Sequence, residues 1–213
     1  MASLARADLE SLLHTKNLDR TLTRPEPPGS SVRLDVDCAS TGHAGLDARL
    51  SGGIPRGQVS ELVGPRSSGR TALMLQMIAA STRRGELVAL VDALDMFDVE
   101  SAAAAGADLD RLLWIRGLVV TSPGMCRDLN QRALVQAIRA FTLVLDAGNF
   151  GLVVFDVGEA PSDAIRRLPF TTWLRLQRMV EGTSTVCLLV GSDRLSRSPR
   201  GLSLQASTLR AAV

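Results

Sequence analysis

The chain has 213 residues, of which 46% are hydrophobic, and a formal net charge of +2. This length suits one domain with a sizeable core, and no apolar run approaches the ~18 residues of a membrane-spanning helix. So small a net charge gives no argument for nucleic acid binding by itself. The cysteines are Cys38, Cys126 and Cys187, odd in number and without metal-ligand spacing. We therefore expect reduced thiols and a cytoplasmic protein.

Residues 1–23 are predicted to form an amphipathic helix, because four leucines recur at roughly helical spacing: Leu4, Leu9, Leu12 and Leu13. Residues 24–39 are predicted to be a linker and lead-in, since Pro25, Pro27 and Pro28 exclude regular structure. Residues 40–213 then form the core domain. The leucine stripe is expected to be buried, because soluble proteins rarely leave such a patch bare. It either docks on another subunit or folds back onto its own core.

The core domain contains a pattern typical of a phosphate-binding loop. Residues 58–63 alternate like a buried strand, and a helix is predicted from Thr71 to about Arg83. In a strand, glycine-rich turn and helix, the backbone N–H groups and the helix N-terminus converge on an anion. The predicted cofactor-binding residues are Gly64, Pro65, Arg66, Ser67, Ser68, Gly69, Arg70 and Thr71.

One cation of this loop is unusual. Arg70 stands where a lysine normally reaches the β- and γ-phosphates, and Thr71 stands where a hydroxyl ligates Mg²⁺. Arginine keeps the charge but brings a bulky planar fork where a compact ammonium is usual. Only one of the 24 basic residues, Lys16, is a lysine, and it lies before the linker. No other lysine of the core domain could take this role.

Beyond the loop, short apolar runs alternate with helical patterns. Strands are predicted at 87–91, 112–115, 152–155 and 184–190, with a last one within 202–210, and helices at 134–145 and 171–180. Such alternation predicts an α/β fold, a mostly parallel sheet with helices on both faces. Residues 152–155 are apolar throughout, which indicates burial on both faces of the sheet. Asp156 ends this strand with a carboxylate suited to a Mg²⁺ contact.

Several segments in order carry a family resemblance. Residues 40–42, Leu46-Asp47, residues 53–57 and the loop at 64–71 resemble the nucleotide-binding core of the RecA recombinase family, and the likeness covers roughly residues 40–210. Residues 41–50 most resemble ImuA, the degenerate RecA relatives encoded beside translesion polymerase factors. The resemblance implies a RecA-like P-loop core with ATP and Mg²⁺ as ligands. It also implies that Thr71 and Asp156 would hold the metal.

The sequence departs from the family at the catalytic positions. The family places a water-polarising glutamate two residues after the aspartate of the second core strand, and here Asp92 is followed by Ala93 and Leu94. Asp95 is one residue further on, and such a shift at a strand end points the other way. The family's γ-phosphate sensor, a glutamine, aligns with Ser192. Loss of a general base alone costs about 10²–10⁴ in rate, so efficient hydrolysis is not expected.

A basic segment follows the last long strand. Arg194, Arg197 and Arg200 are interleaved with serine, proline and glycine, where the RecA family carries a DNA-contacting loop. They are the candidate DNA contacts, against the alternative that they are solvated arginines with weak or no DNA binding.

The resemblance implies a non-catalytic accessory role in DNA damage tolerance, within an SOS-type translesion mutagenesis complex. The implied partners are RecA, a Y-family polymerase relative of the ImuB type and a replicative-type polymerase complex. The leucine stripe would contact a RecA protomer or, in self-association, a second copy of the chain. Other interpretations stay open: a slow DNA-dependent ATPase, a nucleotide-binding regulator without turnover, and a loop that merely connects a strand to a helix and binds nothing.

Overall fold

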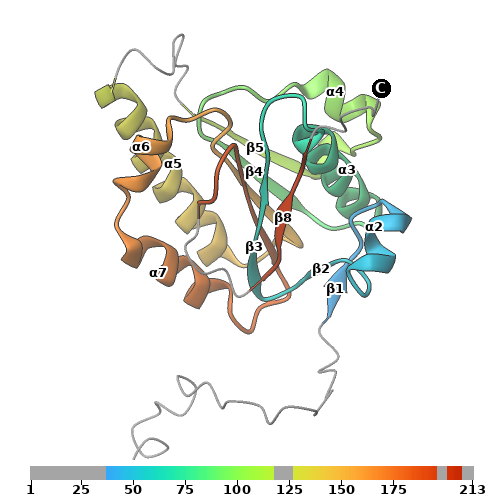
Figure 1. The fold of residues 1–213 in the computed structure, drawn as a ribbon. Helices are drawn as coiled ribbons and strands as arrows, with labels where there is room; N and C mark the ends of the chain where they lie inside the picture. The colour runs from blue at the N-terminus through green and yellow to red at the C-terminus, as the bar shows by residue number, and fades with distance from the viewer. Residues whose placement is uncertain (1–36, 118–126, 196–200, 208–213) are drawn as a thin grey trace, which may run out of the picture. The chain divides into compact units, whose positions relative to one another are not determined.

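The computed structural model describes residues 37–117, 127–195 and 201–207 (Figure 1). By its internal contacts the chain divides into two units, Met1–Asp35 and Val36–Val213. The predicted helix at 1–23, most of the predicted linker, and Arg197 and Arg200 lie outside the described residues. The second unit contains every helix and strand of the described ranges.

A six-stranded sheet forms the centre of this unit, with the strand order β5-β4-β6-β7-β3-β8. Every pairing in it is parallel. The last strand, β8, lies within the stretch 202–210 predicted for it and pairs with residues 61–63 at the end of β3. The strands are β3 (Gln58–Val63), β4 (Val88–Asp92), β5 (Leu112–Arg116), β6 (Leu152–Asp156), β7 (Val186–Gly191) and β8 (Ser203–Gln205).

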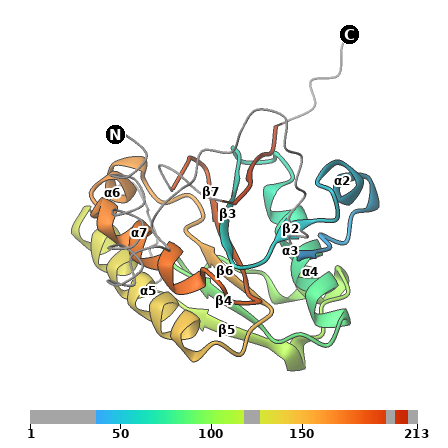
Figure 2. The same ribbon diagram turned by 90° about the horizontal axis from the view of Figure 1, so that it is seen from below.

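Helices cover both faces of this sheet (Figures 1 and 2). One face carries α3 (Arg70–Arg83) and α4 (Val99–Ala104), and the other carries α5 (Arg127–Ala147), α6 (Ser162–Arg166) and α7 (Phe170–Val180). A 3₁₀ turn, η2 (Leu109–Arg111), leads into β5. The predicted α/β fold is confirmed. None of the helices in the described ranges has both the length and the apolar character that crossing a membrane would need.

The core consists of two clusters, one on each side of the sheet. Ala89 and Val91 of β4 belong to the cluster beneath α5 and α7, whereas Val88 and Leu90 belong to the cluster beneath α3. This alternation follows from the period of a strand, whose successive side chains point to opposite faces. All residues of β4 and β7 are buried, as continuous apolar strands predict.

A small N-terminal element precedes the sheet. β1 (Cys38–Ala39) pairs antiparallel with β2 (Ile54–Pro55), and α2 (Ala44–Arg49) lies between them in the sequence. Asp47 accepts hydrogen bonds from the Thr41 N–H at 2.8 Å, the Thr41 hydroxyl at 2.7 Å and the Ser40 hydroxyl at 2.6 Å. The serine, threonine and aspartate of this family-like segment are thus engaged in holding α2. β1 falls within the stretch that the sequence assigned to the lead-in.

Candidate functional site

The chain leaves β3 through residues 64–69 and enters α3 at the carboxyl edge of the sheet. Gly69 precedes the helix with φ 84°, and Ser67 also adopts a left-handed conformation with φ 58°. These turns bring the first turn of a 14-residue helix over the edge of the sheet. N–H groups of a first helical turn have no partner within the helix and favour an anion.

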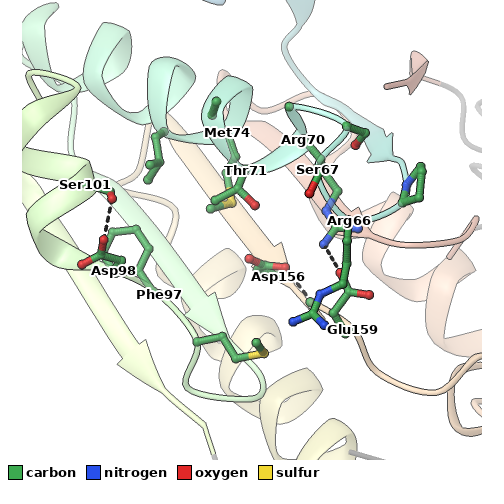
Figure 3. Close-up of a pocket in the computed structure, with 17 residues that line it drawn as sticks. Arg66, Ser67, Arg70, Thr71, Met74, Phe97, Asp98, Ser101, Asp156 and Glu159 are labelled. Carbon is green, nitrogen blue, oxygen red and sulfur yellow. Dashed lines mark hydrogen bonds and ion pairs between the residues drawn. The ribbon is translucent and has the colours of Figure 1, made fainter. Parts of the chain in front are cut away.

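A cleft of about 440 Å³ opens at this edge. Residues 65–71 of the loop and Asp156 at the end of β6 line this cleft together (Figure 3). Gly64 lies behind the loop, where an added Cβ would come within 2.6 Å of the Ser68 hydroxyl and 2.7 Å of the Ala206 carbonyl oxygen. Asp98, Ser101 and Glu159, which no sequence motif indicated, form the remaining polar wall of the cleft.

The Arg70 side chain turns inward and is held by the protein itself. Its Nη1 donates a hydrogen bond to the Gly64 carbonyl oxygen, and its Nη2 lies 2.8 Å from the Glu159 Oε1 (Figure 3). Only 6% of Arg70 is exposed. The cation at the position of the usual lysine is therefore neutralised by a carboxylate from the loop after β6.

Sequence reasoning missed Glu159 because its role depends on strand order. β3 and β6 are not neighbours in the sheet, since β7 lies between them. Their following loops nevertheless meet at the same edge, because parallel strands end there together. The one signal in the sequence is a carboxylate three residues beyond Asp156, and this signal does not identify its partner.

Two buried polar atoms of the loop are left without partners. Arg70 Nε and Ser68 Oγ are buried and have no hydrogen-bond partner among the described residues. Leaving such groups unpaired costs about 1–3 kcal/mol each. The space beside Gly69 is open, with nothing within 4 Å of an added Cβ, and Thr71 is exposed on the first turn of α3. The open space beside Gly69 and the exposed Thr71 thus leave room for a phosphate at the start of α3.

Asp156 is the carboxylate beneath this loop. Its Oδ1 accepts a hydrogen bond from the Gly158 N–H at 2.7 Å. Burial away from water, with the negative charges of Asp92 and Glu159 adding to it, raises the pKa of Asp156 to about 6. At neutral pH the group is therefore ionised but unfavourably placed, a situation that a nearby cation would relieve.

At the position that the resemblance assigns to the water-polarising glutamate, this chain carries Leu94. Leu94 is 3% exposed and packs in the cluster beneath α5 and α7. Asp95, the next residue, has φ 56° and accepts hydrogen bonds at 2.7 Å from both Nε and Nη2 of Arg116. These hydrogen bonds hold the pKa of Asp95 below its usual range. Asp95 therefore faces β5, as the one-residue shift predicted, and does not line the cleft.

The other predicted positions lie apart from the cleft. Ser192 follows β7 and is half-buried outside the cleft lining, and Arg194 is exposed two residues further on. The prediction of a DNA-contacting loop stays a prediction, because its other two arginines lie outside the described residues. In the ranges that the structure describes, no group of three or more acidic, histidine or cysteine side chains could hold a metal ion.

The fold and the cleft together define an α/β domain with a P-loop of RecA-like type. Residues 27–123 match the family described as RecA N-terminal domain. Protein RecA of Ectopseudomonas oleovorans is 46% identical over 182 residues, covering 78% of this chain and 48% of that protein. Protein RecA of Rhodopirellula baltica is 46% identical over 88 residues, covering 41% of this chain and 24% of that protein. These matches support a place in the RecA-like recombinase family.

The structural comparison agrees in fold. The RadB recombinase superposes with a TM-score of 0.50 at 24% identity, covering 72% of this chain and 69% of that chain. The chain spans from about a quarter to about half of the length of these two RecA proteins.

Proposed function

We propose that this chain is a RecA-like accessory protein of DNA damage tolerance, which acts through protein contacts and does not turn over ATP. The observation that carries the proposal is the ion pair of Arg70 with Glu159. In P-loop enzymes the cation at this position stabilises charge on the transferred phosphoryl group. A cation that is already paired with a carboxylate and bonded to a carbonyl stabilises that charge less.

Two further substitutions support the absence of turnover. Leu94 supplies no proton acceptor at the position where the RecA family has its glutamate, and Asp95 is engaged by Arg116. A missing general base costs about 10²–10⁴ in rate. Ser192 has no amide with which to sense a γ-phosphate.

ATP and Mg²⁺ remain the ligands that the loop fits best in chemical terms. Backbone N–H groups of residues 66–71 and the Ser68 hydroxyl would hold phosphate oxygens, and Thr71 with Asp156 would hold the metal. The metal would supply charge neutralisation between phosphate oxygens. A regulator that binds nucleotide without turnover is thus a second candidate, favoured by the unpaired buried donors Arg70 Nε and Ser68 Oγ.

The proposed partners are RecA, a Y-family polymerase relative of the ImuB type and a replicative-type polymerase complex. The likeness of residues 41–50 to the ImuA family supports this choice. We propose that the stripe of Leu4, Leu9, Leu12 and Leu13 docks on a RecA protomer or a second copy of the chain, because burying each leucine contributes roughly 1.5–3 kcal/mol. The basic segment at Arg194, Arg197 and Arg200 would add at most a weak DNA contact.

Two measurements on the full chain test the proposal. Phosphate release with Mg-ATP and single-stranded DNA should stay at background, and turnover comparable to an active recombinase that Thr71→Ala abolishes would refute it. Co-purification with RecA should be lost in the double variant Leu9→Ala, Leu12→Ala and retained in the control Ser11→Ala. Unchanged co-purification in the leucine variant would argue against the proposed docking surface.

A further inference from the structure

The cation that would meet the outer phosphate is paired with the protein's own carboxylate. A lysine at position 70 would reach the β- and γ-phosphates of a nucleotide. Here Arg70 donates one hydrogen bond from its guanidinium group to the Gly64 carbonyl oxygen and another to Glu159. A terminal phosphate seeking this cation would therefore compete with the Glu159 carboxylate, which is 27% exposed at the cleft wall.

The inner part of the site is organised differently. Arg70 is 6% exposed, yet its Nε has no hydrogen-bond partner among the described residues, and neither does Ser68 Oγ. Both belong to the loop whose backbone N–H groups cradle the inner phosphates in P-loop proteins. The loop backbone thus stays available to the inner phosphates, whereas the cation for the outer phosphate is shared with a carboxylate that repels phosphate.

The charged side chains that line the cleft also disfavour an additional phosphate. Two guanidinium groups line it, Arg66 and Arg70, against three carboxylates, Asp98, Asp156 and Glu159. The formal charge of the lining is therefore −1. Like charges in a partly buried site repel more strongly than in water. Each additional phosphate consequently meets a larger penalty, which is greatest beside Glu159.

We infer that Glu159 is a specificity-determining residue that makes this cleft a site for a nucleoside diphosphate in preference to a triphosphate. The inference rests on the proposed function in that it takes the loop to bind nucleotide without turnover. Glu159 discriminates by holding Arg70 and by repelling a third phosphate. No bond is made or broken.

Isothermal titration calorimetry of the full chain with Mg-ADP and Mg-ATP tests this. We expect ADP to bind at least about tenfold more tightly than ATP, which corresponds to about 1.4 kcal/mol. Glu159→Gln keeps the size of the side chain and removes its charge, so it should bring the two dissociation constants to within about twofold of each other. Should Glu159→Gln fail to fold, Glu159→Ala serves the same purpose.

Glu100→Gln is the matched control, since Glu100 is exposed on α4, does not line the cleft and loses the same charge. It should leave the preference for ADP unchanged. Equal or tighter binding of ATP by the wild-type chain would overturn the inference, as would no detectable binding of ADP or an unaltered ratio in the Glu159 variant. Chromatography of the nucleotide after each titration detects hydrolysis, which would refute the proposed function and leave the measured preference standing by itself.

Discussion

Arg70 Nη2 lies 2.8 Å from Glu159 Oε1 at the carboxyl edge of the sheet. Arg70 follows β3 and Glu159 follows β6, and β7 lies between these two strands. The contact joins a cation that is almost fully buried to a carboxylate at the wall of the cleft. The positive charge of Arg70 is therefore neutralised within the protein, whereas the usual cation of such a loop faces its ligand. The same contact has consequences for stability and for the pH response of the fold.

The first prediction concerns the stability of this ion pair. Glu159→Ala should lower the free energy of unfolding by about 1–3 kcal/mol, because it leaves the buried Arg70 charge without its carboxylate. The double variant Arg70→Met, Glu159→Ala should lose less than the sum of the single variants, since neither charge is then left unpaired. Urea unfolding measures all four free energies.

Arg66→Ala is the control for this cycle, because Arg66 is exposed in the same loop. Its effect should stay within about 0.5 kcal/mol. Additive effects of the Arg70 and Glu159 substitutions would contradict the coupling seen in the structure.

The second prediction concerns pH. Asp156 has a pKa of about 6 in the folded chain, against about 3.9 in an unfolded one. Between these values the folded state binds more protons, so the contribution of Asp156 to stability is present below about pH 4 and is lost as the pH rises through about 6. Asp156→Asn should therefore raise the free energy of unfolding by about 1–3 kcal/mol at about pH 8 and give no gain at about pH 4.

Urea unfolding across this pH range measures whether the gain in free energy of unfolding from Asp156→Asn grows as the pH rises. Asp146→Asn, a change at an exposed position of α5, should show no comparable pH-dependent gain. A gain for Asp156→Asn that is larger at acidic than at alkaline pH would rule out the raised pKa.

The third prediction concerns the position of the missing general base. Leu94→Glu should destabilise the fold by at least about 3 kcal/mol, because it places a carboxylate among apolar side chains. Leu94→Met should cost less than about 1.5 kcal/mol, since it conserves volume and polarity. Arg70→Lys alone should give no hydrolysis, because Leu94 still occupies this position.

Thermal or urea unfolding and a phosphate-release assay on the same samples measure both effects. If Arg70→Lys alone gave hydrolysis that responds to DNA, Asp95 or another carboxylate would be serving as the base. If Leu94→Glu were as stable as the wild-type chain, the position would have to be open to water.

Several parts of the fold could be predicted from residues close together in the sequence. The alternation of residues 58–63 and the apolar run of residues 152–155 predict buried strands, and the structure places them as β3 and β6 inside the sheet. Short elements escaped prediction. α2 has six residues and α6 has five, too few to show a helical period. Such helices form where side-chain caps and the packing of neighbours permit them.

The candidate site, like the fold, could be predicted from the sequence only in part. The sequence alone predicted the loop at residues 64–71 and the carboxylate at Asp156, because each belongs to a motif within one strand and its following turn, and the family resemblance singled out position 94. Tertiary structure alone decided that Arg70 is neutralised by Glu159, a residue 89 positions away. The physical reason is that strand order, rather than local propensity, determines which loops meet at the edge of a parallel sheet. An ion pair between two such loops therefore gives no pattern in the sequence from which it could be predicted.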